Sequence, residues 1–219
     1  MTTQRDLCFT PAVELSKLYR AREVSPLEVM QAVLARIDAV NPVVNAIVTL
    51  TREAALREAR RATASLRRSA KLPPLFGVPV GIKDVTQTKG IRTTFGSKLF
   101  EGHVPDEDAL VVQRLRNAGA IVIGKTNTPE FAFGPNTVNS VFGATRNPWN
   151  LALTAGGSSG GSAAALATGM CPLAEGTDLG GSLRGPASYC GVVGFRTTPG
   201  LIPRYPSVLA WDTYSVEGP

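Results

Sequence analysis

The sequence has little of the chemistry that most hydrolases and metalloproteins use. It holds one histidine, His103, and three cysteines, Cys8, Cys171 and Cys190, none of them in a CxxC pair. The odd number and the spacing argue against a disulfide framework or a zinc site and favour buried reduced thiols. We expect His103 in a solvated loop, and a serine or cysteine nucleophile would have to use this histidine or rely on another base.

Long apolar runs are also missing. No stretch of the 219 residues approaches the length needed to cross a bilayer, and the N-terminus, MTTQRDLCFT, lacks the basic start and apolar core of a signal peptide. Hydrophobic residues make up 43% of the chain and charged residues 18%, as in ordinary globular proteins. The sequence therefore predicts a cytoplasmic protein that does not enter a membrane.

The net charge of +6 comes mainly from arginine, much of it in TREAALREARRATASLRRSAK. There the arginines follow helical spacing beside an apolar stripe of Ala55, Leu56, Ala59 and Leu66, which favours a solvated helix face. The alternative is a nucleic-acid surface, but neither interleaved aromatic residues nor a known binding motif accompanies the charge. Nucleic acid is thus not favoured as a partner. The arginines are Arg52, Arg57, Arg60, Arg61, Arg67 and Arg68.

Residues 1–70 are predicted to be helical. Thr10-Pro11 and Ser25-Pro26 each offer an N-cap followed by a proline at the first helical position, and Glu28 completes a capping box with Ser25. We expect that helix to end at Asn41-Pro42, with the arginine-rich helix next. Because these helices carry apolar faces, we expect them to pack on the remainder of the chain.

The sequence pattern changes in residues 71–219, where short apolar runs alternate with predicted helical segments. Strands are predicted at 78–84 and 120–126, separated by a helix over 106–119 that stops at Gly119. Residues 173–177 and 192–196 are further strand candidates. The alternation predicts an α/β fold with a sheet covered by helices. The final WDTYSVEGP shows no closing element, so we expect the chain to be the N-terminal part of a larger single domain.

The stretch AGGSSGGSAAALATG, residues 155–169, could be a linker, a phosphate loop or a chemical site. A flexible linker is polar throughout, whereas here the glycines run into an apolar, helix-competent segment of small residues. A phosphate loop needs a lysine after the glycines, and none follows. Small residues therefore point to a buried place where the backbone approaches something closely.

Two further positions could carry chemistry. Gly180 and Gly181 precede Ser182 at a bend where backbone N–H groups can converge on an oxyanion; a plain glycine turn with a capping serine is the alternative. Lys83 ends a predicted buried strand, where lysine usually snorkels or pairs with an acid. If it is buried near a serine, desolvation lowers its pKa and makes the neutral amine available as a base.

Taken together, the run from Gly156 to Gly194 resembles the signature of the amidase signature family, and GVPVGIKD, KTNTPEFAFG and NPWN are also similar to that family. The resemblance covers about residue 10 to the end. It implies a mixed β-sheet core with helices on both faces, a helical N-terminal region, and amide hydrolysis without cofactor or metal.

The resemblance also implies a Ser-cisSer-Lys triad. Ser182 matches the nucleophile, Ser158 the bridging serine after a cis peptide bond from Gly157, and Lys83 the base. The implied oxyanion hole is formed by the N–H groups of Leu179, Gly180, Gly181 and Ser182. Supporting roles near the site are implied for Gly157, Ser159, Asp178 and Arg184.

Three readings of function remain open. The first is an amidase acting on a small-molecule amide, the second is the glutaminase subunit of a tRNA-dependent amidotransferase, and the third is a non-catalytic amidase-like protein. The KTNTPEFAFGPNT stretch favours the first. A homodimer and the C-terminal part of the same polypeptide stay open as partners. Where the family often has Lys-Pro-Thr after the signature, this chain has Arg196 and Thr197 in FRTTPG, which leaves local details open.

Overall fold

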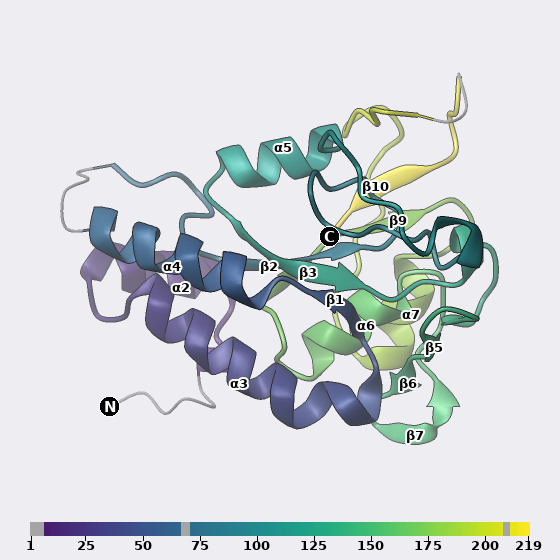
Figure 1. Ribbon diagram of the computed structural model, residues 1–219, viewed down its shortest axis with the longest axis horizontal. Coiled ribbons are helices and arrows are strands. Elements are labelled where there is room, and N and C mark those ends of the chain that lie inside the picture. Colours follow the sequence, from purple (N-terminus) through teal and green to yellow (C-terminus); the bar gives the residue numbers. More distant parts are fainter. Residues whose placement is uncertain (1–6, 67–70, 208–210) are drawn as a thin grey trace.

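A four-stranded sheet lies between helices (Figure 1). The computed structural model describes residues 7–66, 71–207 and 211–219. The strands follow the order β1-β3-β2-β8; β2 runs parallel to β3 and β8, and β1 runs antiparallel to β3. Their bounds are Ile47–Leu50 for β1, Pro79–Lys83 for β2, Ile121–Thr126 for β3 and Leu173–Ala174 for β8. Strand β2 is thus an inner strand, and all its residues are buried.

The two faces of the sheet bury different helices. Val80 and Ile82 of β2 pack in one cluster with Val112 of helix α5 (Leu110–Asn117). The other face contacts α6 (Gly160–Ala167), whose alanines join the larger core cluster. Because side chains alternate along a strand, Lys83 is directed to the α6 face. The mixed sheet with helices on both faces is therefore confirmed.

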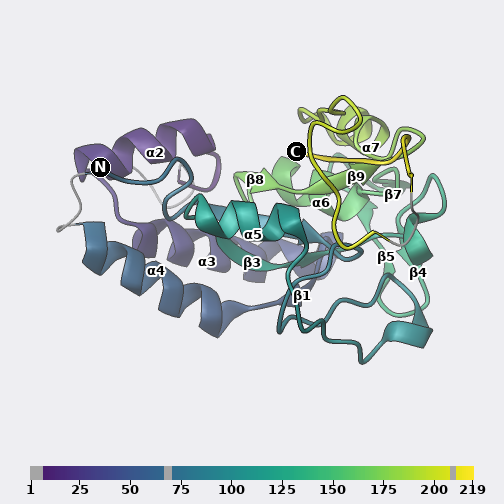
Figure 2. The same cartoon turned by 90° about the horizontal axis from the view of Figure 1, so that it is seen from above.

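Three helices from the N-terminal part lie together at one end of the molecule (Figure 2). They are α2 (Ala12–Ala21), α3 (Pro26–Val44) and α4 (Arg52–Leu66). Ser25 and Glu28 form the predicted capping box at the start of α3. On α4 the predicted alanine stripe is buried and Arg57, Arg60 and Arg61 are exposed. Arg67 and Arg68 lie outside the described residues.

Several predicted boundaries were wrong. Residues 1–70 are not wholly helical, because β1 lies between α3 and α4 and pairs with β3. Helix α3 does not end at Asn41-Pro42 but continues to Val44. Pro42 lies in the last turn and lacks the N–H that would bond to residue 38. The Asn41 side chain holds the exit by accepting from the N–H groups of Ala46 and Ile47 and donating to Ile47 O. Thr10 is not the N-cap of α2, since Pro11 takes that position.

The strand predictions also need correction. Residues 192–196 form no strand, because helix α7 (Arg184–Cys190) ends at Gly191 and irregular chain follows. The predicted strand at 173–177 is interrupted at Glu175 and resumes as β9 (Gly176–Asp178). The final segment does hold an element, β10 (Val216–Gly218), which pairs antiparallel with β9.

Short elements fill the rest of the described chain. They are two-stranded hairpins, which lie near α6 and α7 (Figure 1), and single 3-10 turns. The hairpins are β4 (Val138–Asn139) with β5 (Gly143–Ala144) and β6 (Arg146–Asn147) with β7 (Asn150–Thr154); the turns are η1 (Lys98–Phe100) and η2 (Glu130–Ala132). The three cysteines are buried, as predicted, and form no disulfide with one another. No helix in the described ranges is long and apolar enough to span a membrane.

Candidate active site

Lys83 is a fully buried lysine at the end of the inner strand β2. Its Nζ donates to Ser158 Oγ at 2.6 Å, to Ser159 Oγ at 2.9 Å and to Thr177 Oγ1 at 2.8 Å. An ammonium group has three N–H bonds, so these acceptors account for all of them. The structure therefore brings the predicted base into contact with the predicted bridging serine.

The glycine-rich stretch forms the turn into α6. The Gly157–Ser158 peptide bond is cis, as the resemblance implies. A Cβ on Gly157 would lie 2.8 Å from Gly134 O, and one on Gly161 would lie 2.2 Å from the backbone nitrogen of Asn127. Small residues are therefore required because neighbouring backbone passes against this turn. This supports the reading of the stretch as a buried site rather than a linker.

Thr177 is a contact of Lys83 that the sequence did not single out. It lies on β9, five residues before Ser182, and its backbone N–H donates to Ser159 Oγ at 3.3 Å. Ser159 Oγ in turn donates to Thr177 O at 3.2 Å. The only sequence signal was its place in the GTD run beside the predicted nucleophile turn. Its hydroxyl accepts the third N–H of the Lys83 ammonium.

Ser182 lies beside the two serines of the α6 turn, since its carbonyl oxygen accepts the N–H of Ser159 at 3.1 Å. Its side chain is half-buried, and the preceding Leu179 and Gly180 are exposed. Among the hydrogen bonds of the described residues, none joins Ser182 Oγ to Ser158 Oγ. The last link of the predicted proton relay thus remains a prediction.

The predicted oxyanion hole is shaped by Asp178. Its carboxylate accepts the N–H of Gly181 at 2.9 Å and that of Leu183 at 3.1 Å. A Cβ at Gly180 or Gly181 would meet nothing within 4 Å, so the outer side of this turn is open. The N–H of Gly181 is therefore engaged by the protein itself, and its role toward an oxyanion stays a prediction.

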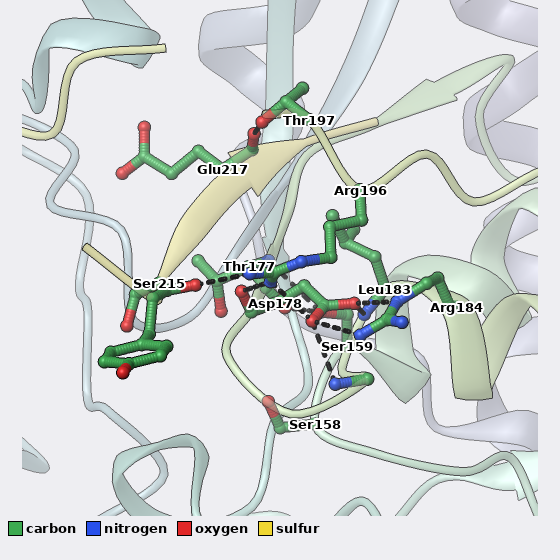
Figure 3. A network of polar contacts seen from close by, with 12 residues as sticks. Ser158, Ser159, Thr177, Asp178, Leu183, Arg184, Arg196, Thr197, Ser215 and Glu217 are labelled. Atoms are coloured by element: carbon green, nitrogen blue, oxygen red, sulfur yellow. Dashed lines mark hydrogen bonds and ion pairs between the residues drawn. The ribbon is translucent and has the colours of Figure 1, made fainter. Parts of the chain in front are cut away.

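Asp178 is a buried carboxylate between two arginines (Figure 3). Arg184 Nε lies 3.0 Å from Oδ2, and Arg196 Nη1 lies 2.8 Å from Oδ1. Burial acts to raise the pKa of Asp178, but the hydrogen bonds from Arg184 and from the two backbone N–H groups outweigh it and hold the pKa well below its usual range. Asp178 and Arg184 thus support the turn. Arg196, which departs from the family pattern, also pairs with Asp178.

The surroundings of Lys83 make its neutral form accessible near neutral pH. Burial lowers its pKa to about 7, while the charges of Glu175 and Asp178 oppose this shift and Arg204 adds to it. A lysine that loses its proton near neutral pH can accept one from a hydroxyl. His103, by contrast, packs between Phe95 and Phe100 and takes no part in this cluster. It is half-buried rather than solvated, which corrects that expectation.

A buried lysine that donates to serine hydroxyls is an arrangement also used by Ser-Lys variants of the catalytic triad. A profile described as Amidase matches residues 28–219, which is most of the chain. The chain therefore belongs to the Amidase family.

Curated relatives are similar over nearly the whole chain. A glutamyl-tRNA(Gln) amidotransferase subunit from Acidothermus cellulolyticus is 50% identical over 214 residues, which is 98% of this chain and 42% of that protein. Its counterpart from Carboxydothermus hydrogenoformans is 47% identical over 98% of this chain and 44% of its own length. The chain thus spans less than half the length of these relatives.

Solved structures agree with the fold. A bacterial aryl acylamidase of the amidase signature family is 31% identical with a TM-score of 0.90, and the match covers 96% of this chain and 44% of that chain. The corresponding amidotransferase subunit from Thermotoga maritima is 37% identical with a TM-score of 0.76, over 90% of this chain and 40% of that chain. Both support the assignment of the chain to part of an amidase signature fold.

Proposed function

We propose that the protein hydrolyses a carboxylic amide through an acyl-enzyme on Ser182, with Ser158 as proton relay and Lys83 as base. The observation that carries this proposal is the 2.6 Å contact between Lys83 Nζ and Ser158 Oγ inside a buried site. Burial also supplies the reason for the base to be neutral near pH 7.

The first half of the reaction forms the acyl-enzyme. Ser182 Oγ attacks the carbonyl carbon while its proton passes to Ser158 Oγ and the Ser158 proton passes to Lys83 Nζ. Backbone N–H groups of residues 179–182 stabilise the oxyanion, to which a well-placed donor contributes roughly 3–4 kcal/mol. The C–N bond then breaks as Lys83, through Ser158, returns the proton to the departing nitrogen.

The second half releases the acid. Water attacks the Ser182 ester and loses a proton through the same relay, and collapse of the second tetrahedral species returns that proton to Ser182 Oγ. The products are one carboxylic acid and one amine or ammonia. No cofactor or metal enters these steps. Within the described residues no group of three acidic, histidine or cysteine side chains is arranged to hold a metal ion.

A panel of aliphatic, aromatic and amino-acid amides tests this proposal. We expect equal amounts of carboxylate and amine from at least one of them, and loss of both in Lys83→Ala. Turnover that persists in Lys83→Ala would contradict the proposed base.

The names of the curated relatives favour a second candidate, the glutaminase subunit of a tRNA-dependent amidotransferase. In this candidate the exposed arginines of α4, Arg57, Arg60 and Arg61, would face RNA or a partner protein. The test is ammonia release from glutamine with and without the other components of such a complex. Release that depends on the partner supports this candidate, and partner-independent hydrolysis of other amides supports the first.

The remaining expectations stay predictions. They are a cytoplasmic location, a homodimer and completion of the site by further chain of the same polypeptide. A non-catalytic role is disfavoured because Lys83, Ser158 and Ser182 are all retained and the first two are in contact.

A further inference from the structure

Glu175 is a buried acid behind Lys83 for which the proposed reaction has no use. Its side chain is only 4% exposed, and it occupies the break between β8 and β9. Oε2 accepts the backbone N–H of Lys83 at 2.9 Å, and Oε1 accepts Thr86 Oγ1 at 2.9 Å. Both oxygens accept hydrogen bonds, which is the pattern of an ionised carboxylate.

The backbone of Glu175 is fixed as firmly as its side chain. Its N–H donates to Gly81 O at 2.8 Å, and its carbonyl oxygen accepts Ser162 Oγ at 2.8 Å. The ladder between β2 and β8 ends at Gly81 and Ala174, so the N–H of Lys83 has no strand partner there. The Glu175 carboxylate takes the place of that partner, because a buried N–H left unpaired is costly.

We propose that Glu175 is a positioning residue for Lys83: its carboxylate holds the lysine backbone at the end of β2, and its buried negative charge acts on the amine of the same residue. This inference rests on the proposed function of Lys83 as base. Among the described residues, the Glu175 side chain has no hydrogen bond to Ser158, Ser159 or Ser182, so its effect on the proposed relay passes through the lysine.

The charges around Lys83 come from several elements. Asp178, at the end of β9, forms ion pairs with Arg184 and Arg196. Two further cations are Arg204, in the segment before the final strand, and Lys125, on β3. The pKa of Glu175 is raised above its usual value because burial outweighs the hydrogen bonds from Lys83 and Thr86 and the charges of Lys125 and Lys83. Asp84 faces Thr94 and the charge of Lys125. Of the acids, Glu175 and Asp178 act on Lys83, and only Glu175 is without an arginine partner.

Glu217 offers a matched comparison. It is 6% exposed, lies directly opposite Thr177 in the β9–β10 pair, and its Oε2 has no hydrogen-bond partner in the described structure (Figure 3). Burial, followed by the charge of Glu175, raises the pKa of Glu217 to about 8, against the opposing charge of Arg204. Glu217 is therefore mostly protonated at pH 7, whereas Glu175 is proposed to be ionised.

The experiment is an NMR titration of the Lys83 side chain in the whole 219-residue chain, with lysine labelled at ¹³Cε and the signal assigned by its loss in Lys83→Arg. In Glu175→Gln the titration midpoint of Lys83 should fall by about one pH unit, because an adjacent negative charge that favours the ammonium is removed. In Glu217→Gln the titration midpoint of Lys83 should not change, because Glu217 is mostly protonated at pH 7. An unchanged or raised midpoint in Glu175→Gln overturns the inference.

A further variant keeps the inference testable if Glu175→Gln does not fold. Glu175→Asp keeps the charge and should preserve the Lys83 midpoint. A lowered midpoint in Glu175→Asp contradicts the charge role.

Activity gives the second readout. The acid limb of the kcat/KM profile should move to lower pH in Glu175→Gln, in step with the NMR midpoint. The titration needs no turnover, so a chain without amidase activity would refute the proposed function and leave the inference about Glu175 to be decided by NMR.

Discussion

Lys83 Nζ lies 2.6 Å from Ser158 Oγ, although the two residues are 75 positions apart in the chain. The lysine ends the inner strand of the sheet, and the serine begins the turn into the helix that covers that strand. The contact is therefore produced by the packing of α6 on β2, and any change that shifts this packing should act on catalysis.

Lys83→Ala should lower amide hydrolysis roughly 100-fold or more, the usual contribution of a general base. Circular dichroism should be recorded for the variant, because the substitution leaves the buried carboxylate of Glu175 without the charge of the lysine. Lys89→Ala is the matched control, since Lys89 is an exposed lysine a few residues away. Equal losses in both variants would show that the effect is not specific to the base.

The pH dependence of kcat/KM should report Lys83. Because the neutral amine is the active form, the rate should rise with pH and level off above the Lys83 pKa of about 7. An unperturbed lysine would give a rise near about pH 10.4 instead. A profile that stays flat from about pH 5 to about pH 9 would contradict a lysine base.

Gly157→Ala should destabilise the fold by about 1–3 kcal/mol and reduce activity, because the added methyl group meets backbone atoms of residues 134–136 that cannot yield easily. Gly180→Ala is the control, since a Cβ there meets nothing within 4 Å. Denaturant unfolding checks both variants. Similar midpoints for the two would mean that the turn before Ser158 is less tightly enclosed than described.

Asp178→Asn should destabilise the protein at pH 7, because it removes the charge of a buried carboxylate that pairs with Arg184 and Arg196. The folded-state pKa of Asp178 is depressed, so its contribution is present above the unfolded value of about 3.9 and is lost as the pH falls below it. The gap between wild type and variant should therefore shrink at acid pH. Asp38→Asn, which removes an exposed pair with Arg52, should cost at most about 1 kcal/mol.

The sequence predicted the parts of this fold that depend on local pattern. Periodic apolar residues and a capping box located α3 and α4, and buried runs located β2 and β3, because these signals lie within a few residues of each other. The end of α3 was misjudged because the Asn41 side chain, and not the chain break expected at Pro42, sets the exit.

The site was predicted through the resemblance and only in part from the residues. Lys83 and Ser158 could be paired because family motifs mark them. Thr177 and Glu175 were not predicted as site residues. Their roles depend on the interruption between β8 and β9, which is a tertiary feature without a local sequence signal. The link of Arg196 to Asp178 likewise joins residues 18 positions apart.

Labelling with a serine-reactive fluorophosphonate tests the central claim most directly. The account predicts one adduct, on Ser182, identified by mass spectrometry in the folded chain. It also predicts its absence in Ser182→Ala and much slower formation in Lys83→Ala. A folded wild-type chain without an adduct on Ser182, or one labelled equally fast in Lys83→Ala, would contradict the account.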